Sequence, residues 1–282
     1  MEYAERVSMR LICEIGINHN GDMDRARELI RQARECDWDS VKFQKRDVET
    51  VYTKEFLDSP RESPWGTTQR DQKMGLEFSI EQMAELFDYA HLFDLEAFAS
   101  AWDFKSLQQV ESLNPPHHKI ASAFITHHDF CRKVASYGRH TFISTGMSTI
   151  AEIGHVVHIF RDAKCDFTLM HCISTYPCPE EKCNIRVIQG LRTVFDCKVG
   201  YSGHETGIMP SILAAALGAV AIERHCTWDR SAYGSDQSAS LERRGMELLA
   251  KYARGAQDAL GDGIKRLLPE EIEVAKKLKY WE

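Results

Sequence analysis

Short apolar runs alternate along the chain with longer amphipathic segments. The short runs predict strands at LICEIG (11–16), SVKFQK (40–45), LEAFAS (95–100), HKIASA (118–123), HTFIST (140–145), FTLMHC (167–172), KVGYS (198–202) and VAIERH (220–225). Between them, amphipathic segments predict helices, for example at 23–35, 79–93, 148–163 and 209–219. The strands are largely apolar on both faces, as expected of strands that helices cover. The alternation predicts an α/β fold, a closed (β/α)8 TIM barrel rather than an open sheet.

One segment interrupts this rhythm. Residues 46–78 form a polar connection that is too long for an ordinary strand-to-helix loop. Long loops at the carboxyl ends of barrel strands usually shape the active site, so we expect this one to lie near it. No linker or second domain is visible. We therefore predict a single domain over 1–282, with the barrel core over about 11–263 and a charged tail over 264–282.

Composition excludes several classes of partner. The chain has 282 residues, of which 43% are hydrophobic, enough to bury a large core. A net charge of −7 without a basic run argues against a nucleic-acid partner. The sequence has neither a long apolar stretch nor a signal-peptide core in MEYAERVSMR, so we expect no membrane partner and a cytoplasmic protein. The nine cysteines are scattered, and no two of them form a Cys-x-x-Cys motif. The sequence therefore indicates neither a zinc knuckle nor a disulfide framework.

Candidate chemistry lies at the strand ends. His204 and His225 end two successive predicted strands. Because the carboxyl ends of barrel strands converge on one face, these imidazoles could share a divalent metal. The alternative is that each is a hydrogen-bonded core histidine, which is the commoner role of a single strand-end histidine. Lys42, Lys119 and His171 also lie at strand ends, which indicates one polar site.

Short motifs recur in order at these strand ends. They are EIGINHNG (14–21), VKFQ (41–44), KIAS (119–122), ISTGMS (143–148), MHCISTYPCP (170–179), GYSGHETG (200–207) and IERHCTWD (222–229) with GSDQSASLE (234–242). Together they resemble the motifs of the sialic acid synthase family, which condenses phosphoenolpyruvate with N-acetylmannosamine or a related sugar. The resemblance extends over roughly residues 11–245.

The resemblance implies a phosphoenolpyruvate site. Lys42 and Lys119 match the two phosphoenolpyruvate lysines of the family, and Ser122, Ser144 and Ser202 match its serine donors. A phosphate dianion with a carboxylate needs fixed cations and hydroxyl or backbone donors, which these residue types provide. Two alternatives remain: either lysine could extend into solvent, and Ser144 could be a helix cap.

The resemblance also implies a catalytic centre. His204 and His225 match the ligands of a divalent cation, usually Mn²⁺, with Mg²⁺ or Co²⁺ as alternatives. This cation polarises the aldehyde oxygen of the open-chain sugar as a Lewis acid. Glu14 matches an active-site carboxylate near the metal and the sugar, and its alternative role is an ion pair with Lys42. Carbon 3 of phosphoenolpyruvate attacks the aldehyde, water adds, and the tetrahedral intermediate expels phosphate.

The resemblance also implies a sugar site. Its positions are matched by Gln44, Tyr176 and Asp236, and Ser174 stands where many members have an asparagine. Two further departures concern binding. In KIASAF, Phe124 replaces a sugar-facing glutamate, and in SAWD, Ala101 removes a hydroxyl that helps to hold phosphoenolpyruvate.

Strand alternation from Ser122 would direct Phe124 into the site as an outer wall. We therefore expect N-acetylmannosamine to be a poor acceptor and a modified sugar aldehyde to be preferred. The alternative is that Phe124 turns outward and packs against Phe130.

Family members commonly continue into a small antifreeze-like C-terminal domain that reaches over the partner subunit. This sequence stops at 279–282, where that domain would begin, so we expect the mouth to be covered differently, for example by 46–78. The resemblance also implies a homodimer.

Three functions remain open. The first is a transferase that joins phosphoenolpyruvate to a sugar aldehyde and makes a nonulosonic acid-type 2-keto-3-deoxy acid. The second is a non-catalytic barrel paralogue that binds a sugar or a partner synthase. The third is a deoxy-octulosonate or heptulosonate phosphate-type synthase, whose phosphorylated acceptor needs an additional basic cluster, with Arg186, Arg192 and Arg224 as candidates.

Overall fold

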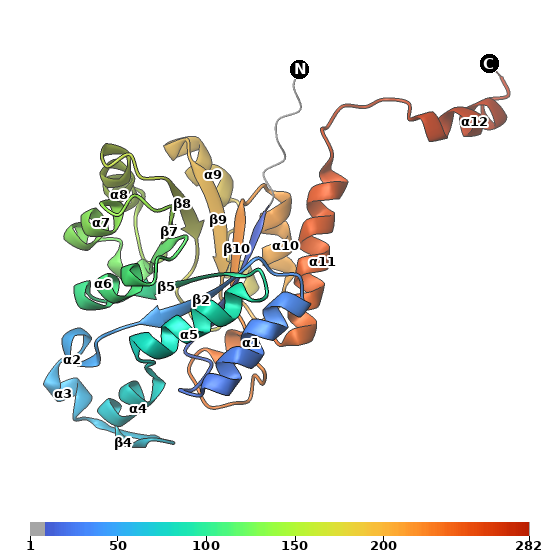
Figure 1. Ribbon diagram of the computed structural model, residues 1–282. Helices are drawn as coiled ribbons and strands as arrows, with labels where there is room; N and C mark the ends of the chain where they lie inside the picture. The colour runs from blue at the N-terminus through green and yellow to red at the C-terminus, as the bar shows by residue number, and fades with distance from the viewer. Residues whose placement is uncertain (1–8, 282) are drawn as a thin grey trace.

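The computed structural model describes residues 9–281, so the segment MEYAERVS and Glu282 lie outside it. Parallel strands close a barrel in the order β1-β10-β9-β8-β7-β6-β5-β2 (Figure 1). They are β1 (Arg10–Gly16), β2 (Ser40–Lys45), β5 (Glu96–Ala101), β6 (His118–Ile120), β7 (Thr141–Ser144), β8 (Phe167–His171), β9 (Lys198–Gly203) and β10 (Ala221–His225). Each coincides with a predicted strand, so the predicted TIM barrel is confirmed.

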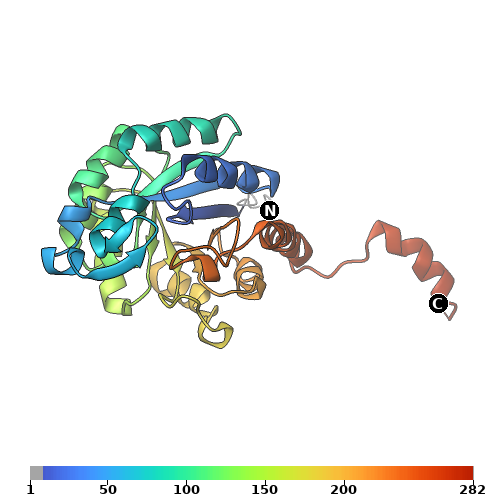
Figure 2. The same ribbon diagram turned by 90° about the horizontal axis from the view of Figure 1, so that it is seen from below.

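Helices surround the barrel, as the view in Figure 2 shows. They are α1 (Met23–Glu35), α5 (Ile80–His91), α6 (Phe104–Ser112), α7 (His128–Ala135), α8 (Ile150–Asp162), α9 (Val187–Phe195), α10 (Met209–Ala216) and α11 (Arg243–Leu260). Helix starts follow local chemistry: Ser79 and Thr149 open α5 and α8 with capping boxes that satisfy free N–H groups. The four helices predicted from periodicity are all present.

The fourth barrel strand is shorter than predicted. After β6 the chain forms a 3-10 turn, η1 (Ser122–Phe124), in which the Phe124 N–H donates to the Ala121 carbonyl at 2.9 Å. The Phe124 ring lies 4.9 Å from the Phe130 ring, between centroids, and edge-on to Trp102. This aromatic cluster accounts for the turn, because the partly buried phenyl ring packs there rather than in the cavity. Strand alternation therefore does not apply to Phe124.

The 46–78 connection is an ordered insert. It contains α2 (Val48–Val51), α3 (Lys54–Leu57), α4 (Gln69–Leu76) and an antiparallel hairpin of β3 (Pro60–Ser63) and β4 (Gly66–Thr68). Since it follows β2, it lies at the carboxyl ends of the strands, below them in Figure 1. The ring of Trp65 meets Tyr233 edge-on at 5.8 Å, so the insert rests on the connection between β10 and α11. A Cβ at Gly75 would lie 2.1 Å from Trp65, which explains the glycine there.

The C-terminal helix α12 (Pro269–Leu278) lies apart from the barrel beyond α11 (Figure 1). Among the helices of residues 9–281, none is both long and apolar enough to cross a membrane.

The core has two parts. The larger one fills the layer between the strands and the helices, and a smaller one inside the barrel consists of Ile12, Phe98, Phe142, Met170 and Ala221. This inner cluster fills the middle of the barrel and separates the polar side chains at the carboxyl ends of the strands from those at the amino ends, such as His117 and His140.

Trp38 links the start of β2 to the last barrel helix. Its ring is buried, and its indole N–H donates to the Met246 carbonyl of α11 at 3.3 Å. We expect Trp38→Ala to lower the free energy of unfolding by about 3–5 kcal/mol, because it leaves a large cavity. In urea unfolding, Leu92→Ala is the control and should change stability by less than about 0.5 kcal/mol, because Leu92 is 78% exposed. A similar small loss in Trp38→Ala would contradict this role.

Candidate active site

A cavity of about 260 Å³ opens at the carboxyl ends of the barrel strands. It is lined by Glu14, Lys42, Gln44, Ser100, Trp102, Lys119, Ala121, Ser122, Ala123, Ser144, Met147, Cys172, Ser174, Tyr176, Ser202, His204, Glu223 and His225. Of the residues predicted to act in catalysis or to bind the substrates or the metal, all except Asp236 are in this lining. The Asp236 carboxylate lies just behind it, 3.7 Å from Nδ1 of His225. The structure thus brings the predicted residues together, while their individual roles stay predictions.

A buried ion cluster forms the floor of the cavity. Lys119 Nζ donates to both carboxylate oxygens of Glu223, at 2.7 and 2.6 Å. Lys42 Nζ lies 2.7 Å from Glu14 Oε2 and 3.7 Å from Glu223 Oε1. All these side chains are buried. The two lysines therefore balance two carboxylates, and the free site carries almost no net charge.

Burial and pairing act differently on these groups. Burial raises the pKa of Glu14, despite the opposing charge of Lys42. Burial acts in the same direction on Glu223, but Lys119 and Lys42 outweigh it, so the pKa of Glu223 is lowered. Burial also lowers the pKa of Lys119 against the attraction of Glu223. Glu14 is consequently the carboxyl group of the cluster that takes up a proton most easily.

Glu223 was missed by the sequence analysis, although a signal was present. It lies two residues before His225 on β10, so strand alternation directs both side chains into the barrel. A glutamate that follows the apolar residues VAI inside a barrel strand needs a buried partner, and the lysines of β2 and β6 supply it. Ser202 adds a hydrogen bond to Glu223 Oε1 at 3.2 Å. Glu223 therefore fixes the lysines in place.

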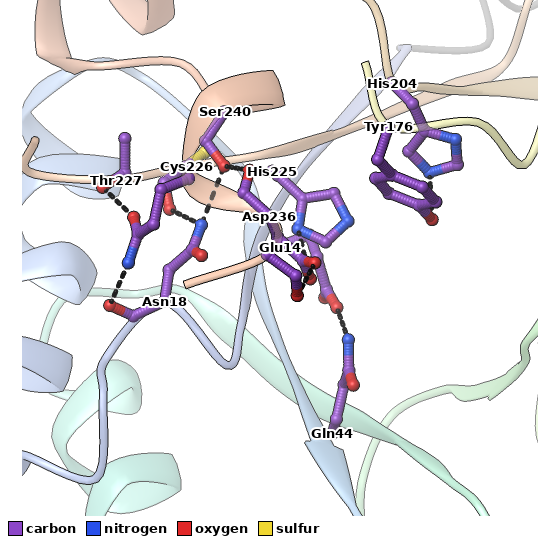
Figure 3. A network of polar contacts seen from close by, with 12 residues as sticks. Glu14, Asn18, Gln44, Tyr176, His204, His225, Cys226, Thr227, Asp236 and Ser240 are labelled. Atoms are coloured by element: carbon purple, nitrogen blue, oxygen red, sulfur yellow. Dashed lines mark hydrogen bonds and ion pairs between the residues drawn. The ribbon is translucent and has the colours of Figure 1, made fainter. Parts of the chain in front are cut away.

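Glu14 is held from the side opposite Lys42. The Gln44 side-chain amide donates to Glu14 Oε1 at 2.9 Å (Figure 3). Gly16 permits this approach: its φ is +54°, and a Cβ there would lie 2.9 Å from the same carboxylate oxygen. The carboxylate is thus fixed between β1 and β2 beside His225.

The two imidazoles lie next to each other in the cavity, with ring centroids 5.7 Å apart and ring planes inclined at 51° (Figure 3). Nδ1 of His204 donates to the Ile173 carbonyl at 2.7 Å, because a carbonyl can only accept. Nε2 of His204 is then the free acceptor, and the Tyr176 hydroxyl donates to it at 2.9 Å. Nδ1 of His225 is buried without a hydrogen-bond partner among the described residues.

Both rings are held neutral. Burial lowers the pKa of His204 to about 4, and it also lowers the pKa of His225. A neutral imidazole is the form that binds a metal, and one first-row ion with nitrogens at about 2.1 Å can bridge rings at this separation. Within residues 9–281 no group of three or more His, Cys, Asp or Glu side chains is arranged to hold an ion. The two imidazoles therefore fit a metal site that leaves most positions to water and substrate.

Some sequence expectations are wrong. His171 does not line the cavity, because its Nε2 bonds the Cys183 carbonyl at 2.8 Å. Phe124 is not part of the cavity wall and packs against Phe130. It therefore gives no reason to expect N-acetylmannosamine to be a poor acceptor. Ala101 faces the layer between strands and helices, and its neighbour Ser100 lines the cavity instead.

The expectations for the 46–78 insert and for the three arginines are also not met. None of residues 46–78 lines the cavity, so the insert borders the mouth rather than covering it. The three arginines proposed for a phosphorylated acceptor are not there either. Arg224 is buried against Glu205 at 2.9 Å, Arg192 donates to the Gly218 carbonyl at 2.6 Å, and Arg186 does not line the cavity.

The protein is a parallel barrel whose strand ends carry lysines, hydroxyls and two imidazoles. This arrangement is typical of the active site of a barrel enzyme that binds an anionic substrate. The chain belongs to the NeuB family, whose model matches residues 29–265. It is 40% identical over 271 residues to N-acetylneuraminate-9-phosphate synthase of Mus musculus, covering 95% of this chain and 76% of the relative. It is 33% identical to N,N'-diacetyllegionaminic acid synthase of Campylobacter jejuni, covering 95% and 83%.

Solved structures agree with this assignment. The structure of N-acetylneuraminic acid synthetase from Leptospira borgpetersenii, in complex with citrate, matches with a TM-score of 0.85 at 28% identity. The match covers 96% of this chain and 93% of that one. This chain is therefore a sialic acid synthase-like enzyme of the NeuB family.

Glu223 is expected to be essential for the stability of the site. In Glu223→Gln, two buried lysines lose their shared counter-charge, which should lower the free energy of unfolding by about 3–5 kcal/mol. Ser202→Ala is the matched control, because it removes one hydrogen bond from the same carboxylate and should cost about 1 kcal/mol. Equal urea midpoints for these two variants would show that Glu223 does not hold the lysines.

Proposed function

We propose that the protein is a phosphoenolpyruvate-dependent transferase. It joins phosphoenolpyruvate to a sugar aldehyde, forms a nonulosonic acid-type 2-keto-3-deoxy acid and releases phosphate. The observation that carries this proposal is the presence of two buried lysines and two neutral imidazoles in one cavity. The names of the mouse and Campylobacter relatives describe synthases of such acids, which supports the same chemistry here.

Lys42 and Lys119 would bind the phosphate and carboxylate of phosphoenolpyruvate. Hydroxyl groups of Ser122, Ser144 and Ser202 line the same part of the cavity and would donate the remaining hydrogen bonds. The lysines are positioned before the ligand arrives, because Glu14 and Glu223 hold both ammonium groups. This preorganisation lowers the cost of ordering flexible side chains on binding.

A divalent cation, which we propose to be Mn²⁺, would be held by His204 and His225. When bound, it would supply Lewis-acid polarisation of the aldehyde oxygen. The Ile173 carbonyl orients the His204 ring so that its Nε2 points into the cavity, and Tyr176 occupies that nitrogen in the free protein. The Asp236 carboxylate lies 3.7 Å from Nδ1 of His225, close enough to interact with the ring by charge but too far for a hydrogen bond.

The acceptor would lie between the imidazoles and the mouth. Its hydroxyls would meet Gln44, Ser174, Tyr176 and Asp236, and Glu14 would lie close to the reacting aldehyde. Carbon 3 of phosphoenolpyruvate forms a bond to the aldehyde carbon, whose oxygen becomes a hydroxyl. Water adds at carbon 2, and phosphate leaves with the bridging oxygen.

The runner-up functions have less support. A Thermotoga maritima heptulosonate phosphate synthase structure matches with a TM-score of 0.68 at only 13% identity, which indicates the fold alone. A non-catalytic paralogue would not need paired lysines beside paired imidazoles. The cytoplasmic location stays a prediction from the sequence, and the homodimer stays a prediction from the family resemblance.

The direct test is release of inorganic phosphate from phosphoenolpyruvate in the presence of Mn²⁺ and a panel of aldoses. We expect phosphate and a 2-keto acid in equal amounts with at least one N-acylated hexose. No phosphate release with any aldose would refute the proposal.

The metal should be required for turnover. Chelation is expected to abolish activity, Mn²⁺ to restore it, and the combined change His204→Ala, His225→Ala to remove both bound metal and turnover without unfolding the barrel. His158→Ala is the control, because its imidazole is exposed on α8. Full activity of rigorously metal-free protein would contradict the assignment.

The two lysines should be required for phosphoenolpyruvate binding. Lys42→Met and Lys119→Met each remove a charge-assisted contact, so calorimetry should show affinity lowered roughly 10- to 100-fold. Lys119→Met should also lower the melting temperature, since Glu223 loses its closest partner. Lys133→Met on α7 is the control. Wild-type phosphoenolpyruvate affinity in both site variants would place the ligand elsewhere.

A further inference from the structure

Two buried thiols lie against each other beside the active site. The Sγ atoms of Cys178 and Cys183 are 3.9 Å apart, and the two residues are only 4% and 1% exposed. Both are free cysteines, and they flank the short 3-10 helix η2 (Glu180–Lys182). The turn of η2 brings them together, because the Cys183 N–H donates to the Glu180 carbonyl at 3.1 Å. A disulfide bond is about 2 Å long, so the two sulfurs would have to approach by about 2 Å to form one.

The segment that carries these thiols reaches into the active site. Tyr176 lies two residues before Cys178, and its hydroxyl donates to Nε2 of His204 at 2.9 Å. The Cys178 N–H donates to the carbonyl of the same histidine, also at 2.9 Å. On the other side of η2, the Cys183 carbonyl accepts a hydrogen bond from the His171 ring at 2.8 Å. Hydrogen bonds therefore join the two cysteines to the ends of β8 and β9, so a shift of Cys178 would be passed to Tyr176 and His204.

The cover over the two thiols is thin. Residues 179–182, which connect them, are all exposed, and so are residues 175–177 on the N-terminal side. Within the fully described stretch between β8 and α9, η2 is the only regular element, so this stretch can move without breaking the barrel. Burial raises the pKa of Cys183 to about 11, which keeps this thiol protonated and slow to react while the turn is closed. Opening of the turn would expose both sulfurs to a small oxidant.

We propose that Cys178 and Cys183 are a reversible oxidation site whose disulfide displaces Tyr176 and lowers turnover. With hydrogen peroxide as the oxidant, one sulfur is oxidised to a sulfenic acid and one water leaves. The second thiol then attacks that sulfur, which forms the disulfide and releases a second water. The two electrons and two protons lost by the thiols go to the peroxide, and a thiol reductant reverses the reaction. Formation of the bond does not depend on the proposed function, whereas its effect on turnover rests on it.

The test treats the purified protein with hydrogen peroxide, removes the oxidant with catalase, and then adds Mn²⁺, phosphoenolpyruvate and the best aldose of the panel. Non-reducing peptide mapping by mass spectrometry should find the Cys178–Cys183 linkage. Phosphate release should fall about tenfold and recover with dithiothreitol, because a displacement of about 1 Å in an active site is costly. Cys183→Ser and Cys178→Ser cannot form the bond, so each should keep its own untreated activity. Cys197→Ser is the matched control: Cys197 is partly exposed and lies outside the pair, so this variant should lose activity as the wild type does.

Two readouts need no turnover and therefore separate this inference from the proposed function. Peptide mapping detects the linkage directly, and calorimetry should show that the oxidised protein binds Mn²⁺ more weakly than the reduced protein, because Tyr176 and His204 have moved. These readouts decide the inference even when the reduced protein consumes no aldose, a result that refutes only the proposed function. Absence of the linkage overturns the inference, as does a linkage that changes neither turnover nor Mn²⁺ affinity. If peroxide inactivates Cys183→Ser like the wild type, the sensitive thiol is another one, such as Cys172 in the cavity wall, and the inference is wrong.

Discussion

The site depends on the ion cluster of Glu14, Lys42, Lys119 and Glu223 inside the barrel. Removing charged groups from water costs several kcal/mol for each ion, so the barrel can hold two lysines only because two carboxylates and their hydrogen bonds compensate them. The same pairing keeps both ammonium groups at the strand ends, where an anionic substrate can reach them. A substrate with more negative charge than the lysines can balance then needs a further positive group, which a cation held by the two imidazoles would provide.

The apolar inner core and the polar site occupy different levels along the barrel axis. Phe98, Phe142 and their neighbours fill the interior with apolar side chains, and the charged groups of the cavity lie on the carboxyl-end side of them. Two-residue alternation on each strand assigns side chains to one layer or the other. On β10, for example, Glu223 and His225 enter the cavity, whereas Arg224 points outward and is buried against Glu205.

Much of this was predictable from the sequence because it depends on local periodicity. Strand ends fixed the positions of Lys42, Lys119, His204 and His225, and the closed barrel brought them together. Phe124 was predicted wrongly because its ring finds an aromatic cluster that a local pattern cannot reveal. Glu223 was overlooked because its role depends on lysines from two other strands. The internal structure of the 46–78 insert was equally hidden, since its packing follows from contacts such as Trp65 with Tyr233 rather than from periodicity.

The central claim is that this cavity condenses phosphoenolpyruvate by breaking its carbon–oxygen bond. It is tested most directly with phosphoenolpyruvate labelled with ¹⁸O at the bridging oxygen, followed by ³¹P NMR and mass spectrometry of both products. Because water adds at carbon 2 before phosphate leaves, the label should appear in inorganic phosphate and not in the 2-keto acid. Label retained in the organic product would contradict the account, as would phosphoenolpyruvate that stays intact with every acceptor.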